Sequence, residues 1–156
     1  MHIEKKVTKI LIKNKKTLSL AESCTGGLLS SRLTDISGSS KFLKAGIVTY
    51  SNEAKTKFLK IPSQLIKTHG AVSSQVAIKM ANNIRKALDS DYGIGITGIA
   101  GPMGGTKNKP VGLVFIAASS KKRVICIQCQ FKGSRLTIKS KACKKALELL
   151  SVLLHE

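Results

Sequence analysis

The sequence predicts an α/β fold in which a mixed β-sheet carries helices on both faces. Segments with apolar residues at helical spacing alternate with short apolar segments over the first two-thirds of the chain. Two strand-like segments then follow each other without a helix between them, which is typical of an antiparallel pair. The 156 residues, 42% of them hydrophobic, suffice for one domain with a buried core.

The first third of the chain predicts helix, strand, helix and strand in turn. Residues 1–15 place apolar side chains at helical spacing between lysines, which is the pattern of an amphipathic helix. A short apolar strand follows at residues 17–21. A second helix begins after Gly27 and runs to about Thr34, where turn residues end it. Residues 45–50 form the next strand.

The rest of the chain predicts a helix, a strand, an antiparallel pair and a final helix. Ser73 precedes a long helical pattern and is expected to cap the N-terminus of that helix. Residues 93–97 are a buried strand, which a glycine-rich loop follows. Residues 111–118 and 124–131 form the antiparallel pair, and residues 138–153 form the last helix.

The net charge of +19 invites comparison with nucleic-acid-binding proteins, because clustered Lys and Arg release counterions when they bind phosphate. Only four of the 27 basic residues are Arg, the side chain that reads bases and phosphates with two parallel hydrogen bonds. Two Tyr, four Phe and no Trp leave few rings for stacking on single strands. The lysines are spread through every segment, so we expect solvated surfaces and regard a nucleic-acid partner as unlikely.

Cysteine and histidine are too few and too scattered for the common metal and triad sites. Cys126 and Cys129 lie three positions apart on a predicted strand, so their side chains point to opposite faces and should not chelate one ion. No second pair completes a zinc set, and Cys24 and Cys143 are interpreted as buried reduced thiols. A Ser-His-Asp triad would have to use His69, since the other two His lie at the termini. We therefore predict no metal site.

Ligands of open α/β sheets bind beyond the carboxyl ends of strands, and two unusual loops stand at such ends. Residues 21–27 lead from a strand into a helix N-terminus, whose free N–H groups favour an anion, but they lack the Gly-Lys-Ser ending of a P-loop. Residues 97–106 are rich in glycine, which lets the backbone approach a ligand closely. An ordinary turn remains the alternative interpretation of both loops.

A further loop, residues 38–42, and the segment 49–55 after the next strand suggest a nucleophile and its base. A serine needs a base to become a nucleophile, and with no convenient histidine the nearby candidate is Lys55, assisted by Tyr50. A lysine acts as a base only when neutral, so its ordinary pKa of about 10.4 must fall through burial or a neighbouring cation. We therefore expect Lys55 to be buried, unlike most of the other lysines.

Several motifs together resemble the CinA C-terminal domain family. They occur in order along nearly the whole chain, so residues 1–156 are interpreted as one domain of that kind. The motifs are AESCTGG at 21–27, GSS at 38–40, VTYSNEAK at 48–55, HGAVS at 69–73, GIAGP at 98–102 and KPVG at 109–112.

This resemblance implies a three-layer α/β/α sandwich with a mixed, mostly parallel five-stranded sheet. It implies a nicotinamide-nucleotide amidohydrolase, which converts nicotinamide mononucleotide (NMN) to nicotinic acid mononucleotide and ammonia in NAD salvage. Ser40 would be the nucleophile and Lys55 its base, with Tyr50 between them and no metal or cofactor. A free-standing homodimer acting on a small molecule is expected, and the absence of an export signal predicts a cytoplasmic protein.

The resemblance also directs substrate contacts to the loops described above. Backbone N–H groups around residues 38–40 or in the loop after Gly98 are expected to hold the oxyanion of an acyl-transfer reaction. The residues expected to bind substrate are Thr25, Gly26, Gly27, Ser39, Thr97, Gly98, Gly101 and Arg135.

Three positions depart from the family pattern and bear on substrate choice and turnover. Met103 and Ser134 stand where acidic residues are expected, and Lys139 replaces an arginine, whose planar fork a point charge does not reproduce.

Two other functions stay open. A catalytically silent regulatory protein, linked to competence or the DNA damage response, would leave Lys55 exposed, and a nucleic-acid-binding module would gather lysines on one face.

Overall fold

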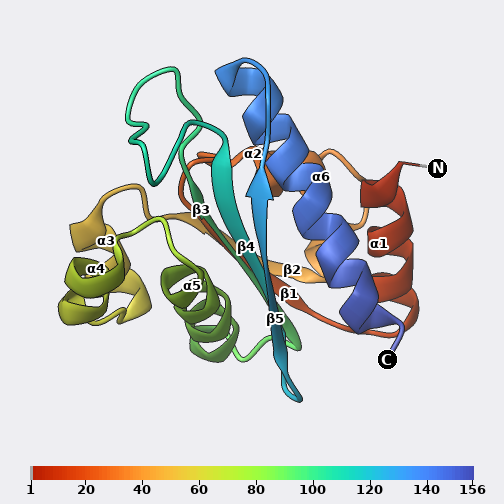
Figure 1. Cartoon of the computed structure of the whole chain (residues 1–156). Helices are drawn as coiled ribbons and strands as arrows, with labels where there is room; N and C mark the ends of the chain where they lie inside the picture. Colours follow the sequence, from red (N-terminus) through yellow and green to blue (C-terminus); the bar gives the residue numbers. More distant parts are fainter. Residues whose placement is uncertain (1) are drawn as a thin grey trace.

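The computed structural model describes residues 2–156 and places five strands in one sheet (Figure 1). The strands are β1 (Leu18–Glu22), β2 (Leu43–Val48), β3 (Tyr92–Gly98), β4 (Leu113–Ser120) and β5 (Val124–Gln130). Their order across the sheet is β2-β1-β3-β4-β5. β1 pairs parallel with β2 and β3, while β4 pairs antiparallel with β3 and β5. The predicted mixed sheet is confirmed, because β4 runs against the other described strands.

Helices cover both faces of this sheet. They are α1 (Ile3–Lys13), α2 (Leu28–Thr34), α3 (Asn52–Leu59), α4 (Ser63–His69), α5 (Ser74–Ala87) and α6 (Arg135–Leu154), with a 3-10 turn at Ser39–Lys41. Figure 1 shows α1, α2 and α6 on one face and α3, α4 and α5 on the other. The three-layer α/β/α sandwich is therefore confirmed, as is the capping of α5 by Ser73, whose Oγ accepts the Val76 N–H.

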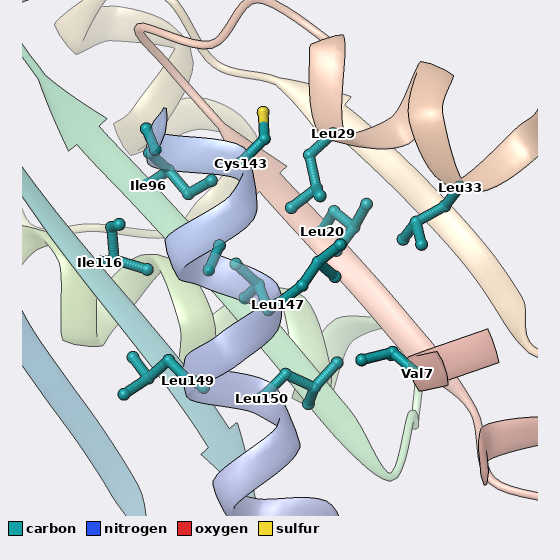
Figure 2. Close-up of a cluster of buried hydrophobic side chains, with 14 of the residues drawn as sticks. Val7, Leu20, Leu29, Leu33, Ile96, Ile116, Cys143, Leu147, Leu149 and Leu150 are labelled. Carbon is teal, nitrogen blue, oxygen red and sulfur yellow. The ribbon is translucent and has the colours of Figure 1, made fainter. Parts of the chain in front are cut away.

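The main apolar core lies between the sheet and the layer of α1, α2 and α6 (Figure 2). Leu20 of β1 and Ile96 of β3 point into this core and share it with Leu147 of α6, and none of the three is exposed. Successive side chains of a strand point to opposite faces, so Ala21 belongs to the other core, together with Met80 of α5. Burial of one such Leu or Ile side chain contributes about 2 kcal/mol to stability, so packing holds both layers.

Helix α5 packs directly on the backbone of β3, because two glycines of that strand face it. A Cβ added to Gly93 would overlap the Ala81 carbonyl oxygen, and one added to Gly95 would overlap that of Ala77. Only glycine leaves room for this approach. The contact fixes where α5 begins, and with it one wall of the cavity described below.

Two short helices, α3 and α4, were not predicted from the sequence. Their apolar periodicity is weak because they are short and largely exposed, and because the inward face of α3 includes a lysine, Lys55, beside Leu59. The local signal lies in a cap instead: Ser51 Oγ accepts the Ala54 N–H at 3.0 Å, the usual device for starting a helix. Strand β2 also begins earlier than predicted, at Leu43.

The cysteines are free thiols. Cys126 packs on the α5 side of β5 and Cys129 on the α6 side, which confirms that they point to opposite faces. Burial raises the pKa of Cys24 to about 11 and that of Cys143 to about 12, so both are buried thiols as predicted.

Within residues 2–156 no group of three His, Cys, Asp or Glu could hold a metal ion. In the same range, no helix is long and apolar enough to cross a membrane.

Candidate functional site

A cavity of about 260 Å³ lies beyond the carboxyl ends of β1, β2 and β3. Parallel strands bring their carboxyl ends to one edge of the sheet, which is where ligands of open α/β sheets bind. Ser23 follows β1, Tyr50 and Lys55 follow β2, and Thr97 is the second-last residue of β3. All four line the cavity. Arg135, at the start of α6, lines its mouth.

Ser23 and Lys55 form the chemical centre of this cavity. Ser23 continues the alternation of β1 and points toward the layer of α3 and α5, where Lys55 of α3 lies. The Lys55 side chain is 1% exposed, and its Nζ lies 3.1 Å from Ser23 Oγ. Burial lowers the pKa of Lys55 below its ordinary value. The predicted burial of this lysine is confirmed.

Lys55 Nζ has three oxygen neighbours. It lies 2.9 Å from the Thr49 carbonyl oxygen, 3.1 Å from Ser23 Oγ and 3.5 Å from the Tyr50 carbonyl oxygen. These oxygens can accept from the three donors of an ammonium, whereas a neutral amine would donate to the two carbonyl oxygens and accept from the Ser23 hydroxyl. The lowered pKa of Lys55 favours the neutral form. Of the described residues that line the cavity, none carries a carboxylate that would favour the ammonium form.

The pairing of Ser40 with Lys55 is wrong. Ser40 lies in the 3-10 turn before β2 and is exposed, whereas Lys55 lies beyond the far end of β2. A strand of this length separates its two ends by about 20 Å. Ser39 stands in the same turn, so neither it nor the N–H groups of residues 38–40 can contact a ligand in the cavity. Ser23 takes the position that the sequence analysis gave to Ser40.

Tyr50 is brought to the cavity, but its hydroxyl does not lie between serine and lysine. The side chain is 60% exposed, and its hydroxyl accepts a hydrogen bond from Arg135 Nη2 at 2.9 Å. Arg135 Nη1 donates to the Gly101 carbonyl oxygen at 2.6 Å. Arg135 thus joins the glycine-rich loop after β3 to the loop before α3, across the mouth of the cavity.

Thr97, Gly98 and Gly101 form the wall opposite Lys55. Thr97 is 1% exposed, and its Oγ1 donates to the Ala71 carbonyl oxygen at 2.9 Å, which ties β3 to the segment before α5. Gly101 has a φ of +73°, and a Cβ there would overlap Val111, so this turn of the loop requires glycine. These predicted residues line the cavity together with Met103, whose side chain is 85% exposed.

Thr25, Gly26 and Gly27 lie beside the cavity rather than in its wall. The Thr25 hydroxyl is fully buried and donates to Glu22 Oε1 at 2.7 Å, so it is not available to a ligand. Lys139 covers this turn, with its Nζ 3.7 Å from the position a Cβ would take on Gly26. The Thr25 side chain is therefore committed to Glu22, and the expected contact of the N–H groups of these three residues with an anion remains a prediction.

Sequence reasoning missed the role of Ser23, as well as Cys24 and Asn52, which also line the cavity. The available signal was the place of Ser23 directly after a strand and before a helix. Ser40, by contrast, lies in a turn that precedes a strand. Only the topology tells which strand ends meet at one edge of the sheet.

The sequence model of the CinA C-terminal domain family matches residues 1–154. The chain is 47% identical over 142 residues to a CinA-like protein of Endomicrobium trichonymphae, covering 91% of this chain and 33% of the relative. It is 48% identical over 149 residues to a CinA-like protein of Syntrophus aciditrophicus, covering 95% and 36%. The chain thus spans about a third of the length of these curated relatives.

Solved structures agree with these matches. The competence/damage inducible protein CihA of Agrobacterium tumefaciens superposes with a TM-score of 0.92 at 34% identity, covering 100% of this chain and 98% of that one. A CinA superfamily protein of Escherichia coli gives a TM-score of 0.92 at 36% identity, covering 97% and 88%.

Proposed function

The chain belongs to the CinA C-terminal domain family, and from that premise we propose that it is an amidohydrolase that converts NMN to nicotinic acid mononucleotide and ammonia. The observation that carries this proposal is the Ser23–Lys55 pair: a buried amine of lowered pKa, 3.1 Å from a serine hydroxyl, at the wall of a cavity. A serine with an adjacent neutral base is the arrangement that acyl transfer requires.

The proposed reaction uses the pair twice. Lys55 takes the proton of Ser23 while Oγ attacks the carboxamide carbon of the nicotinamide ring. The tetrahedral intermediate collapses as Lys55 gives the proton to the amide nitrogen, so that the C–N bond breaks, ammonia leaves and an acyl-enzyme ester on Ser23 remains. Water then attacks the ester carbon, with Lys55 again as base, and the carboxylate product leaves as Ser23 regains its proton. Tyr50 supplies its carbonyl oxygen to Lys55 and is not needed as a relay, because Lys55 contacts Ser23 directly.

The oxyanion of this reaction needs a donor next to the nucleophile. The Cys24 N–H, directly after Ser23, makes no backbone–backbone hydrogen bond among the described residues, so it is the proposed donor to the oxyanion. In acyl-transfer enzymes one such donor contributes about 3 kcal/mol to transition-state stabilisation. The glycine-rich loop after Gly98 faces the same cavity and is the candidate source of a second donor.

The phosphate of NMN would bind near Arg135, the cation at the cavity mouth. Lys139 lies one helical turn further along α6 and adds positive charge beside it. Ser134 caps α6, since its Oγ accepts the Thr137 N–H at 3.2 Å, so this departure from the family pattern keeps the helix start. Met103 adds an exposed apolar side chain at the rim of the cavity.

The two alternative functions have less support. A silent homologue was expected to expose Lys55, which is instead 1% exposed. A nucleic-acid-binding module was expected to gather lysines on one face, yet lysines lie on α1 and α6 in one layer and on α3, α4 and α5 in the other. The expected homodimer and cytoplasmic location remain predictions, and analytical ultracentrifugation would test the first.

Ammonia release from NMN by the purified protein tests the proposal. We expect activity in the wild type, a loss of about 10³-fold or more in Ser23→Ala, and activity within about twofold of wild type in Ser40→Ala, a serine at the other end of β2. Release of no ammonia by a folded wild-type protein would reject NMN as substrate. Activity that survives in Ser23→Ala but not in Ser40→Ala would reject the assignment of the nucleophile.

A further inference from the structure

Glu22 is a buried carboxylate directly before the nucleophile, and the proposed mechanism does not use it. Its side chain is 0% exposed, and it accepts four hydrogen bonds without donating one. The donors are Thr25 Oγ1 at 2.7 Å, the Leu29 N–H at 3.0 Å, the Ser30 N–H at 3.0 Å and Ser30 Oγ at 2.6 Å. Such a set satisfies a buried carboxylate.

The alternation of β1 separates Glu22 from Ser23 while keeping them adjacent in the chain. Glu22 lies on the same face of β1 as Leu20, toward α2 and α6, and Ser23 lies on the opposite face, toward Lys55. Both oxygens of Glu22 hold the turn and helix that follow Ser23. The carboxylate therefore restrains the backbone on the far side of the sheet from the reacting atoms.

The main chain of Glu22 is also connected to Lys55, through Thr49. The Glu22 carbonyl oxygen accepts the Thr49 N–H at 2.9 Å, and the Thr49 carbonyl oxygen accepts from Lys55 Nζ at 2.9 Å. One residue thus connects to both members of the pair: to Ser23 through the peptide bond and to Lys55 through Thr49. Both connections run through residues next to the contact between Ser23 and Lys55.

We propose that Glu22 is a positioning residue, whose carboxylate holds the turn after β1 so that Ser23 Oγ faces Lys55 and the Cys24 N–H faces the developing oxyanion. This inference rests on the proposed role of Ser23 and Lys55. It assigns the carboxylate no proton transfer and no contact with substrate. Because a misplacement of about 1 Å costs about 100-fold in rate, loss of this carboxylate lowers the reactivity of Ser23 without removing any reacting group.

The test compares Glu22→Gln with Asp91→Asn. Gln keeps the size of the side chain but turns an NH₂ group toward donors, two of them backbone N–H groups that cannot turn around. Asp91 is a matched control, because it accepts from the Thr17 N–H at 2.9 Å, Thr17 Oγ1 at 3.0 Å and Lys16 Nζ at 3.2 Å at the opposite end of the sheet. Each variant replaces one accepting oxygen of a carboxylate by an NH₂ group. Only in Glu22→Gln is that carboxylate next to Ser23.

The main readout is the rate at which a fluorophosphonate labels Ser23, followed by mass spectrometry, since it needs no substrate turnover. We expect about 100-fold slower labelling in Glu22→Gln and an unchanged rate in Asp91→Asn, both measured on folded protein. With NMN, kcat should fall by a similar factor while KM stays within about twofold. If the wild-type protein is labelled at Ser23 but does not hydrolyse NMN, NMN is rejected as the substrate, and the labelling rates still test the role of Glu22.

Equal labelling of Glu22→Gln and wild type overturns the inference, as does an equal loss in Asp91→Asn. A wild-type Ser23 that the probe does not label overturns it as well, together with the assignment of the nucleophile. If Glu22→Gln does not fold, Ser30→Ala removes one donor to the carboxylate in a milder way. Severalfold slower labelling of that variant supports the inference, and an unchanged rate overturns it.

Discussion

The two ends of the parallel strands both contain buried polar side chains, but those side chains are partnered differently. At the amino end, Ser19 and Ser90 share a hydrogen bond of 2.5 Å and neither is exposed. Asp91, nearby, accepts from Thr17 and Lys16. Each polar group at this end has a partner of complementary chemistry, and the arrangement ties strands together.

At the carboxyl end, the buried base has no acid beside it. Lys55 is as fully buried as Ser19, but it faces two carbonyl oxygens and a hydroxyl, and it borders a cavity. Burying a potential cation without a counter-charge costs stability unless the group is neutral. Burial of polar groups alone therefore does not distinguish the proposed reactive site from a structural one, and the difference between the two ends is the uncompensated lysine at a cavity.

The largest difference in activity between the two ends should come from replacing one lysine at each end. Lys55→Met removes the base while filling its space, and we expect a loss of about 10³-fold in kcat/KM. Lys44→Met is the matched control, because Lys44 Nζ donates to the Leu88 and Asp89 carbonyl oxygens near the amino end of β2. Its activity should stay within about twofold of wild type. Steady-state ammonia release measures both, and substantial activity in Lys55→Met would contradict the role of the base.

The pH dependence of stability should have the same sign at the two ends but fall in different pH ranges, because the pKa of Lys55 and that of Asp91 are both lowered in the folded chain. Lys55 is active when neutral, so kcat/KM should fall about tenfold per pH unit below its pKa, with a midpoint below 10.5. The unfolded chain binds this proton more tightly than the folded one, so the free energy of unfolding should also rise with pH between the two pKa values. A pH profile of activity in wild type, and of stability in wild type against Lys55→Met, measures this.

Asp91 should respond in a lower pH range. Partial burial raises the pKa of Asp91, but hydrogen bonds from Thr17 and Lys16 outweigh this effect and bring it below 3.8. Its contribution to stability is therefore present above pH 3.8 and is lost as pH falls through the lowered pKa. Acid unfolding that is identical in wild type and Asp91→Asn would contradict this part of the comparison.

Arg135→Ala should have a smaller effect, on binding. Arg135 holds the Gly101 carbonyl oxygen and the Tyr50 hydroxyl, and it is the proposed phosphate partner, so we expect KM for NMN to rise about tenfold. Arg123→Ala is the control, since Arg123 pairs with Glu156 away from the cavity. An Arg135→Ala variant with unchanged KM would show that the phosphate binds elsewhere.

The smallest effect should come from the amino end. Ser19→Ala leaves Ser90 without its partner, and we expect a loss of about 1 kcal/mol in the free energy of unfolding with unchanged kcat. Chemical denaturation and ammonia release measure the two quantities. A loss of activity in folded Ser19→Ala would show that the two ends are not independent.

The sequence predicts much of the fold because long elements carry clear periodicity. Helices α5 and α6 and the β4–β5 pair follow from apolar spacing, and the cap at Ser73 follows from local chemistry. Helix α3 is not predicted from the sequence, because its inward face contains a lysine where an apolar residue would be typical. The lysine that obscures this helix in the sequence is also the proposed base.

The site is predicted less well, and the reason is topological. Lys55 and the family resemblance point to a Ser-Lys pair, and the local signal that favours Ser23 over Ser40 is only its place directly after a strand. Their distinction depends on β1 and β2 being neighbours with the same direction, since only then do Ser23 and Lys55 leave the sheet at one edge. The partners of Glu22 are also spread over several positions of a helix, and spacing alone does not assign them to one carboxylate.

The direct seating of α5 on Gly93 and Gly95 has a consequence for protein engineering. Elsewhere in the core, a larger side chain can be accommodated by rearranging its neighbours, but this seam has no side chains on the β3 side to rearrange. Added bulk at either glycine would push against the backbone of α5, which follows the segment whose Ala71 carbonyl oxygen holds Thr97. Substitutions at these glycines are therefore a way to alter the cavity from a distance, and a design that aims to preserve the cavity should leave both glycines unchanged.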